Sequence, residues 1–354
     1  MNRTLFPGTM GPEGFISCFD SLMDEARLKR KLILKGGPGV GKSTFMRRVH
    51  AALCAHGESS TLYFCSGDPD SLDGVAIPHA GLLILDGTAP HIVDPEIPGA
   101  RDSIINLGVC LNEAAMRPRL PHIRSCMADH AICTRRARAC LSAAAALSRD
   151  CASVLRSVMD ETHCAHMTNA LIQSILSQEG EKRSAPNVRR ILTEAVTPKG
   201  MLCLIAENAQ PRVFRLSSHW GMDLTPVLQK ISLAVRAAGY DVEEHLCPTA
   251  PERLLHVSIP ALGTLITTCD LLSSEQTFDF SACIPQGALL RHECALEQGR
   301  AGIQLHLHRA SSALAEAKQL HDELESFYVP NMDFERWQKI LDETLTSLDV
   351  SEQT

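Results

Sequence analysis

The chain has 354 residues, of which 45% are hydrophobic and 21% charged, so it is globular rather than disordered. At about 150 residues per domain, this length suggests two domains. The net charge of -7 argues against a nucleic-acid partner, which would need a basic face. The sequence has no run of about 18 apolar residues, no signal segment and no lipidation motif, so we expect a cytoplasmic protein without a membrane partner.

The first hundred residues show alternating signals for strands and a helix. Residues 31–35 (KLILK) are an apolar run that ends in glycines, which indicates a buried strand. Residues 42–56 carry apolar side chains at helical spacing, and residues 61–65 and 81–86 indicate two more strands. This order of elements predicts an α/β fold with a parallel sheet.

Two later segments are expected to be helical. Between about 101 and 187 the strand signals disappear, and Ala, Arg and Leu dominate, as in LSAAAAL at 141–147. We interpret this segment as a helical insertion or lid. Strand signals return within 190–196, 211–216, 243–247 and 263–268, and from about 290 to 350 the chain again favours helix.

The chain repeats itself in sequence as well as in the order of its elements. Residues 39–88 match residues 221–270 in one constant register without a gap. The identical pairs include Gly39/Gly221, Cys65/Cys247, Val75/Val257, Gly81/Gly263 and Ile84/Ile266. The helical tails also match when 166–176 is aligned with 331–341. We interpret the chain as a tandem duplication of parallel-sheet domains, each followed by a helical segment.

Residues 36–43 (GGPGVGKS) fit the Walker A pattern of a phosphate-binding loop. Glycines allow the backbone to fold around phosphate groups, and the helix that follows points its positive end at them. The lysine reaches the β- and γ-phosphates, and the serine hydroxyl is a ligand for Mg²⁺. The residues expected to bind the nucleotide are Gly36, Gly37, Pro38, Gly39, Val40, Gly41, Lys42, Ser43 and Thr44.

An acidic residue ends the strand expected at 81–86. Asp86 follows four apolar residues, and in phosphate-loop proteins this position holds Mg²⁺ directly or through water. Ser43 and Asp86 are therefore the expected metal ligands, and Lys42 and Asp86 the expected catalytic groups. Gly87 stands where many ATP-driven machines carry a glutamate that activates water, which argues against a fast motor ATPase.

Three more carboxylates follow the second expected strand. Asp68, Asp70 and Asp73 lie in one acidic loop, CSGDPDSLDGV at 65–75. Phosphoryl transfer to an alcohol needs a carboxylate that accepts the hydroxyl proton, and Asp68 is the first candidate for that role and Asp70 the second. The alternative is that Asp-Pro-Asp-Ser is turn chemistry. His91 could sense the γ-phosphate, although a surface histidine is the simpler interpretation.

Two patterns mark the first helical segment. Cys126, Cys133 and Cys140 recur at a heptad spacing and are expected to share one helix face. Six arginines could reach phosphates from a lid, with a solvated face as the alternative. They are Arg117, Arg119, Arg124, Arg135, Arg136 and Arg138.

The second repeat has lost the groups that would bind a nucleotide. Its apolar positions match those of the first repeat, whereas its polar positions do not. The replacements of the first loop are Pro38 by Trp220, Gly41 by Asp223, Lys42 by Leu224, Ser43 by Thr225 and Asp86 by Thr268. We therefore expect residues 190–354 to bind no nucleotide.

Several of these strings together resemble a known family. GGPGVGKST, CSGDPDSLDG, IPHAGLLILDGTAPH and DPEIPGARDSIINLG are similar to segments of bacterial P-loop ATPase-like, nucleotide-binding proteins known mainly from Firmicutes. The resemblance extends over nearly the whole chain, including the duplication. It implies a P-loop NTPase fold and ATP binding, and it implies no particular substrate.

These observations predict a P-loop NTPase domain at 1–187 and a degenerate repeat at 188–354. We expect the first repeat to bind ATP and Mg²⁺ and to carry out slow ATP hydrolysis or phosphoryl transfer. One alternative is a kinase for a small molecule or nucleotide that uses Asp68 or Asp70 as base. Another is a nucleotide-dependent switch or scaffold with little turnover, which acts on a protein partner.

Overall fold

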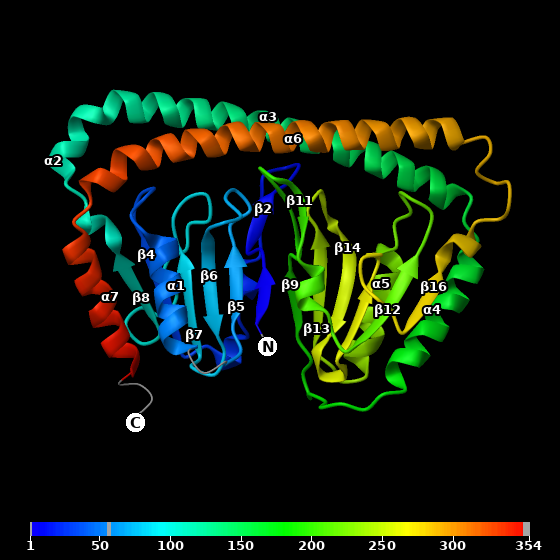
Figure 1. Ribbon diagram of the computed structural model, residues 1–354. Helices are drawn as coiled ribbons and strands as arrows, with labels where there is room; N and C mark the ends of the chain where they lie inside the picture. Colours follow the sequence, from blue (N-terminus) through cyan, green and yellow to red (C-terminus); the bar gives the residue numbers. More distant parts are fainter. Residues whose placement is uncertain (1, 55–57, 350–354) are drawn as a thin grey trace.

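The computed structural model describes residues 2–54 and 58–349 and shows two α/β units side by side (Figure 1). The first unit is built on one six-stranded sheet. Its strands, in spatial order, are β1 (Arg3–Leu5), β5 (Thr61–Phe64), β6 (Leu72–Ile77), β7 (Leu82–Asp86), β4 (Arg30–Lys35) and β8 (Asp102–Asn106). The strand β4 runs parallel to β7 and β8, whereas β6 runs antiparallel to both of its neighbours.

The prediction of parallel sheets is thus wrong at β6 and at its counterpart in the second sheet, β14 (Ala250–Ile259), which is also antiparallel to both neighbours. Neither strand was recognised in the sequence. The segment 65–75 was interpreted as one acidic loop, but its last residues enter β6, which is buried along its whole length. The strand β8 was also missed, since it lies within the segment expected to be helical. Most side chains of its sequence, DSIIN, are exposed or half-buried, as is typical of a strand at the edge of a sheet. Such strands need few apolar residues, so they are hard to recognise in sequence.

The second unit repeats the sheet of the first in the same spatial order. Its strands are β9 (Val188–Ile191), β13 (Val242–Cys247), β14 (Ala250–Ile259), β15 (Thr264–Thr267), β12 (Arg212–Ser217) and β16 (Gln276–Asp279). The register of the sequence alignment, continued toward the N-terminus, matches Arg30 with Arg212. Arg30 is the first residue of β4 and Arg212 the first residue of β12, so the strands agree with this register.

Each unit also carries a small hairpin beside its sheet. The single strand expected over 190–196 is divided between β9 and β10 (Glu194–Thr197), and β10 forms a hairpin with β11 (Gly200–Cys203). The short pair β2 (Gly8–Met10) and β3 (Phe15–Ser17) is its counterpart in the first unit.

One helix follows the loop after β4, and its counterpart follows β12. These are α1 (Lys42–Leu53) and α5 (Thr225–Ala237). The helix expected over 42–56 is confirmed to Leu53, whereas residues 55 and 56 lie outside the described part of the chain. Phe45, Met46 and Val49 turn to the core, as their spacing predicts.

Long helices connect the two units. After a short α2 (Glu113–Met116), α3 (Leu120–Ser157) runs over both sheets, and α6 (Glu293–Tyr328) returns beside it in the opposite direction (Figure 1). The sulfur atoms of Cys126 and Cys133 contact Leu320 and Glu316 of α6, so the expected cysteine face is part of this seam. Among the helices of residues 2–54 and 58–349, none combines the length and apolar character that crossing a membrane requires.

Two glycines let these long helices approach closely at one point. A Cβ on Gly299 of α6 would lie 2.4 Å from the Cys151 sulfur, and one on Gly302 would lie 2.7 Å from a Leu147 methyl. A larger side chain at either position would push the helices apart.

The last helix of each half packs on the sheet unit of the other half. The helix α4 (Glu161–Leu176) follows the first sheet in sequence, yet Leu171 and Ile175 are buried in the core of the second unit. The helix α7 (Phe334–Asp349) follows the second sheet, and Trp337 and Leu341 are buried in the core of the first. The halves 1–187 and 188–354 therefore describe the sequence repeat, while each unit in space contains a helix from the other half.

The register of these exchanged helices differs from the sequence alignment. The amide of Asp160 donates to Cys283 O and that of Asp333 to Cys110 O, and each aspartate caps the helix that follows. Asp160 thus corresponds to Asp333, whereas the alignment of 166–176 with 331–341 pairs Asp333 with Thr168 and is wrong. The register changes between the sheets and the helices because residues 87–101 link β7 to β8, whereas the shorter segment 268–275 links β15 to β16.

A buried carboxylate joins the two units where β1 and β9 meet. Arg3 lies opposite Thr61 in the first sheet, and Arg189 lies opposite Glu243 in the second. Because the sequence alignment matches Thr61 with Glu243, Arg3 and Arg189 occupy equivalent places in the two units. Both arginines bind the same carboxylate: Arg3 donates two hydrogen bonds of 2.9 and 2.8 Å to Glu243, and Arg189 donates one of 3.1 Å. The backbone of β1 continues this junction, because Phe6 N donates to the carbonyl of residue 192.

Candidate functional site

The loop between β4 and α1 is shaped by glycines and anchored by one apolar side chain. Gly39 and Gly41 have φ of 67° and 81°, a region that side chains with a Cβ rarely adopt. Val40, between them, is buried and holds the loop against the core.

The lysine of this loop meets the acidic residue that ends β7. The Lys42 ammonium folds back over the loop and donates to Gly36 O at 3.0 Å and Gly37 O at 2.9 Å. It also lies 3.6 Å from an Asp86 carboxylate oxygen. The structure therefore brings the two expected catalytic groups together.

Ser43 has a structural contact that the second unit preserves. Its hydroxyl oxygen accepts the amide of Leu72 at 3.0 Å, which ties α1 to the start of β6. In the second unit, Thr225 accepts the amide of Leu254 at the same distance of 3.0 Å. The hydroxyl keeps its own proton and a second lone pair, so this contact leaves it able to meet a metal. Thr44 is exposed on the first turn of α1.

Asp86 faces a second buried carboxylate that the sequence analysis placed in a loop. Asp73 lies in β6 beside Asp86, and burial together with the charge of Asp86 raises its pKa to about 7. One Asp86 oxygen accepts both the amide and the hydroxyl of Thr88, at 2.9 and 2.6 Å. Asp73, Asp86 and His91 offer ligand atoms that all lie within 4.8 Å of one another. No local signal in the sequence marks Asp73, because β6 is buried along its whole length and does not alternate between buried and exposed residues.

The carboxylate oxygens of this group suit a hard cation such as Mg²⁺. Mg²⁺ prefers carboxylate and hydroxyl oxygens, which Asp86 and Ser43 supply next to Asp73. The His91 ring stacks on Phe19 with centroids 4.5 Å apart, and burial lowers its pKa, so its neutral form is favoured. An imidazole nitrogen suits Mg²⁺ less well than an oxygen does. His91 is therefore a neighbour of the acidic pair, and the proposed γ-phosphate contact stays a prediction.

The two expected bases, Asp68 and Asp70, are each bound by a lysine from the second half. Lys199, in the turn of the β10–β11 hairpin, donates to both oxygens of Asp70 at 2.9 and 2.7 Å and lowers its pKa. Lys318 of α6 lies 3.6 Å from Asp68, whose carboxylate also accepts the Ser71 hydroxyl. The lowered pKa makes Asp70 a weaker base than a free carboxylate. Two lysines of the second half therefore bind the loop that carries Asp68 and Asp70.

The helix α6 also reaches the glycine loop at residues 36–43. The amide of Gly39 donates to a Glu325 carboxylate oxygen at 3.1 Å, and Tyr328 lies over Gly37. Trp337 of α7 covers Gly41. Sequence analysis missed these residues because they lie in the other half of the chain and belong to no local motif. A carboxylate of the chain therefore binds an amide of the kind that phosphate groups use in such loops.

The six arginines of α3 and the short turn before it were candidates for contacts with phosphate groups, and two of them have other partners. Arg136 pairs with Glu316 at 2.5 Å, and Arg119 lies over the Phe327 ring at 5.8 Å. Within residues 2–54 and 58–349, no hydrogen bond or ion pair joins any of the six to residues 36–43.

The corresponding loop of the second unit is closed by its own side chains. Asp223 accepts the amide of Thr225 at 2.9 Å and pairs with Arg253 at 3.3 Å, so a carboxylate caps α5. Leu224, at the position of Lys42, is buried. Thr268, at the position of Asp86, donates to Leu255 O. These contacts occupy the positions that correspond to Gly41, Lys42 and Asp86 with groups of the chain itself.

No protein-family model, curated protein or solved structure matches this chain.

Proposed function

We propose that the first unit binds Mg-ATP at residues 36–44 and slowly hydrolyses it or transfers its γ-phosphoryl group. The proposal is carried by one observation: Lys42 and Asp86 converge at 3.6 Å at the end of a glycine loop that leads into a helix. In the bound state, Lys42 would exchange the carbonyls of Gly36 and Gly37 for phosphate oxygens. Asp86 and Ser43 would hold Mg²⁺, which neutralises charge that develops on the phosphates.

Asp73 is the stronger candidate for a proton acceptor in this site. A general base works best when its pKa lies near the working pH, and in the chain without Mg²⁺ burial and the charge of Asp86 raise the pKa of Asp73 to about 7. Asp68 and Asp70 are each paired with a lysine. These ion pairs argue against a kinase that uses Asp68 or Asp70 as its base. If phosphoryl transfer to an alcohol occurs, we assign Asp73 the role first given to Asp68.

The contacts of the second half favour a switch as the second candidate function. Glu325, Lys318 and Lys199 all bind loops that a nucleotide would touch. Phosphates that displace Glu325 from Gly39 would break a link between α6 and the phosphate loop. Because α6 extends over both units, such a change would be passed to the second unit. Little turnover combined with a large change in shape on Mg-ATP binding would support this function.

The binding site is tested by calorimetric titration of the full chain with Mg-ATP. Lys42→Ala should weaken binding by about 30-fold or more, because charge-assisted hydrogen bonds to the phosphates are lost. Lys29→Ala removes an exposed lysine just before the other end of β4 and should leave the affinity unchanged. Equal affinities for Lys42→Ala and the unaltered chain would refute the site.

A further inference from the structure

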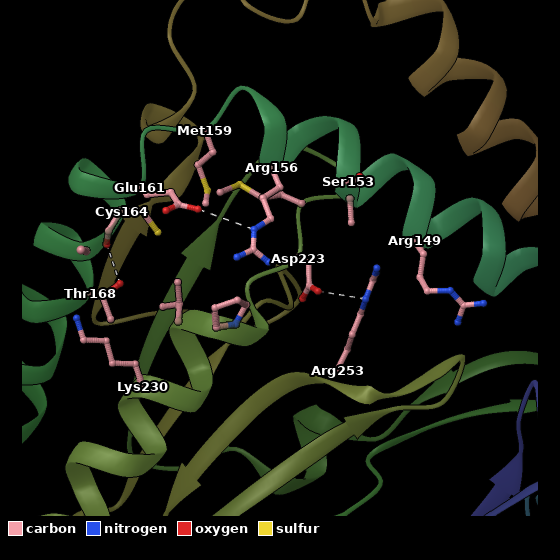
Figure 2. Close-up of a pocket in the computed structure, with 15 residues that line it drawn as sticks. Arg149, Ser153, Arg156, Met159, Glu161, Cys164, Thr168, Asp223, Lys230 and Arg253 are labelled. Atoms are coloured by element: carbon pink, nitrogen blue, oxygen red, sulfur yellow. Dashed lines mark hydrogen bonds and ion pairs between the residues drawn. The ribbon is translucent and has the colours of Figure 1, made fainter.

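The second unit contains a cavity of about 480 Å³ between α3, α4 and α5 (Figure 2). This volume lies within the roughly 300–1,000 Å³ of pockets that hold small molecules. Its lining is mainly apolar and includes Ala152, Met159, Cys164, Met222 and Val227. The pocket is separate from the glycine loop of the first unit, since its walls are α3, α4, α5, β14 and the loop between β12 and α5.

The corresponding place in the first unit is filled by an indole ring. The register that relates Asp160 to Asp333 places Cys164 where the first unit has Trp337. The alignment of the sheets and their helices places Val227 where the first unit has Phe45. Trp337 packs edge-on against Phe45, with centroids 5.9 Å apart. The second unit therefore carries small side chains where the first carries two aromatic rings, and this exchange leaves the cavity.

A cation faces this place in both units. In the first unit, the Arg48 guanidinium lies 5.4 Å from the centre of the Trp337 ring. The residue at the position of Arg48 is Lys230, which lines the pocket. Lys230 has no ion pair within the described part of the chain. The second unit thus has a cation, Lys230, at the position of Arg48, but it has no aromatic ring at the position of Trp337.

The other charged side chains leave the pocket with a positive excess. The cations Arg149, Arg156, Lys230 and Arg253 outnumber the anions Glu161 and Asp223. Arg253 is engaged, since it binds Asp223 at 3.3 Å and the Ser148 hydroxyl at 2.9 Å. Arg156 reaches down from α3 toward the middle of the pocket and touches Glu161 only at 3.9 Å (Figure 2). Arg149 pairs with Glu252, which lies outside the pocket lining, at 3.8 Å. Lys230 and Arg156 are the cations that an incoming anion could engage, since Lys230 has no ion pair in the described part of the chain and Arg156 extends into the middle of the pocket.

We propose that this pocket binds a small organic anion whose flat, apolar body is about the size of an indole. The body would lie on Cys164 and Val227, in the space that Trp337 fills in the first unit. The anionic group would meet Lys230 and Arg156. In the register of the exchanged helices, Ala152 stands at the position of Glu325, so the second unit has no counterpart of the carboxylate that accepts the Gly39 amide in the first unit. This site is independent of Mg-ATP binding at Lys42.

The test is a calorimetric titration of the full chain with three indoles of different charge. Indole-3-acetate should bind with a Kd below about 1 mM, neutral indole should bind at least about fivefold more weakly, and cationic tryptamine should not bind. Saturating Mg-ATP should leave the affinity for indole-3-acetate unchanged. No saturable binding of indole-3-acetate, equal affinity for all three indoles, or competition by Mg-ATP would overturn the proposal.

Variants locate the binding in the pocket. Cys164→Trp introduces the ring of the first unit and should abolish binding of indole-3-acetate. Because this change could disturb folding, the double variant Lys230→Gln/Arg156→Gln provides an independent test and should weaken binding by about tenfold. The control is Arg236→Gln, an exposed residue on α5 outside the pocket, which should bind as the unaltered chain does. Equal binding by the double variant and the control would overturn the assignment.

Discussion

At the residue scale, the phosphate loop is organised around the ammonium group of Lys42. It is held by Gly36, Gly37 and Asp86, all of which lie at the carboxyl ends of β4 and β7. The sequence predicts this group well, because a strand, a glycine loop and a helix are local features. Asp73 shows the opposite case. Its neighbours in sequence are turn formers, so only the pairing of β6 with β7 reveals that its side chain faces Asp86.

Replacing Asp86 tests its assignment as a metal ligand. Asp86→Asn should leave ATP binding nearly intact but raise the Mg²⁺ concentration needed for half-maximal turnover by about tenfold or more, because a charged ligand becomes neutral. Turnover is measured against Mg²⁺ concentration. Asp94→Asn, which alters an exposed aspartate paired with Lys35, is the control. An unchanged Mg²⁺ dependence for Asp86→Asn would show that Asp86 only ends the strand.

At the scale of elements, α6 is the part of the chain that closes the site. It brings Glu325 to the amide of Gly39 and Lys318 to Asp68. The sequence predicts that this segment is helical, but a helical pattern does not say which sheet the helix will cover. The missed strands have local causes: β6 begins in turn residues, and β8 presents residues 103 and 104 to solvent. The tail alignment failed because the two halves have linkers of different length.

Neutralising Glu325 should strengthen ATP binding. In Glu325→Gln the side chain keeps its size but no longer offers a charged competitor for the Gly39 amide. We expect the affinity for Mg-ATP to rise by about three- to tenfold in a calorimetric titration. Glu323→Gln, an exposed change on the same helix, should have no effect. Equal or weaker binding by Glu325→Gln would mean that this carboxylate does not oppose the nucleotide.

At the scale of the whole molecule, the two halves form one structure through exchanged helices and a shared carboxylate. The repeat and its constant register are visible in sequence, and the sheets confirm them. The exchange of α4 and α7 is not visible there, because apolar helix faces are chemically alike. Glu243 is the residue whose loss should affect both units, since it binds equivalent arginines from β1 and β9.

Glu243→Gln should lower the free energy of unfolding by about 3 kcal/mol at neutral pH, because two partly buried arginines lose their common partner. Unfolding in urea measures the change. Glu275→Gln breaks the exposed ion pair with Arg212 and should cost less than about 1 kcal/mol. Similar losses for the two variants would show that the Glu243 junction adds nothing beyond a surface ion pair.

The contribution of Glu243 should also depend on pH. Burial would raise its pKa, but the charges and hydrogen bonds of Arg3 and the charge of Arg189 outweigh burial and hold the pKa below its usual value of 4.5. A carboxylate with a lowered pKa stabilises the folded state above the unfolded pKa and loses this effect as the pH falls through the folded pKa. The difference in unfolding free energy between Glu243→Gln and the unaltered chain should therefore shrink as the pH falls below the usual value of 4.5. If the difference in unfolding free energy stayed constant over this pH range, Glu243 would not be ionised in the folded state.

The number of nucleotides bound per chain tests the central claim most directly: only the first of two equivalent units can hold Mg-ATP. In the second unit, Asp223 caps the helix and Leu224 replaces the lysine, so charge and backbone are both unsuited to phosphate. Equilibrium dialysis at saturating Mg-ATP should give one bound nucleotide per chain, and none for Lys42→Ala. Two per chain, with one remaining in Lys42→Ala, or none in the unaltered chain, would contradict the account.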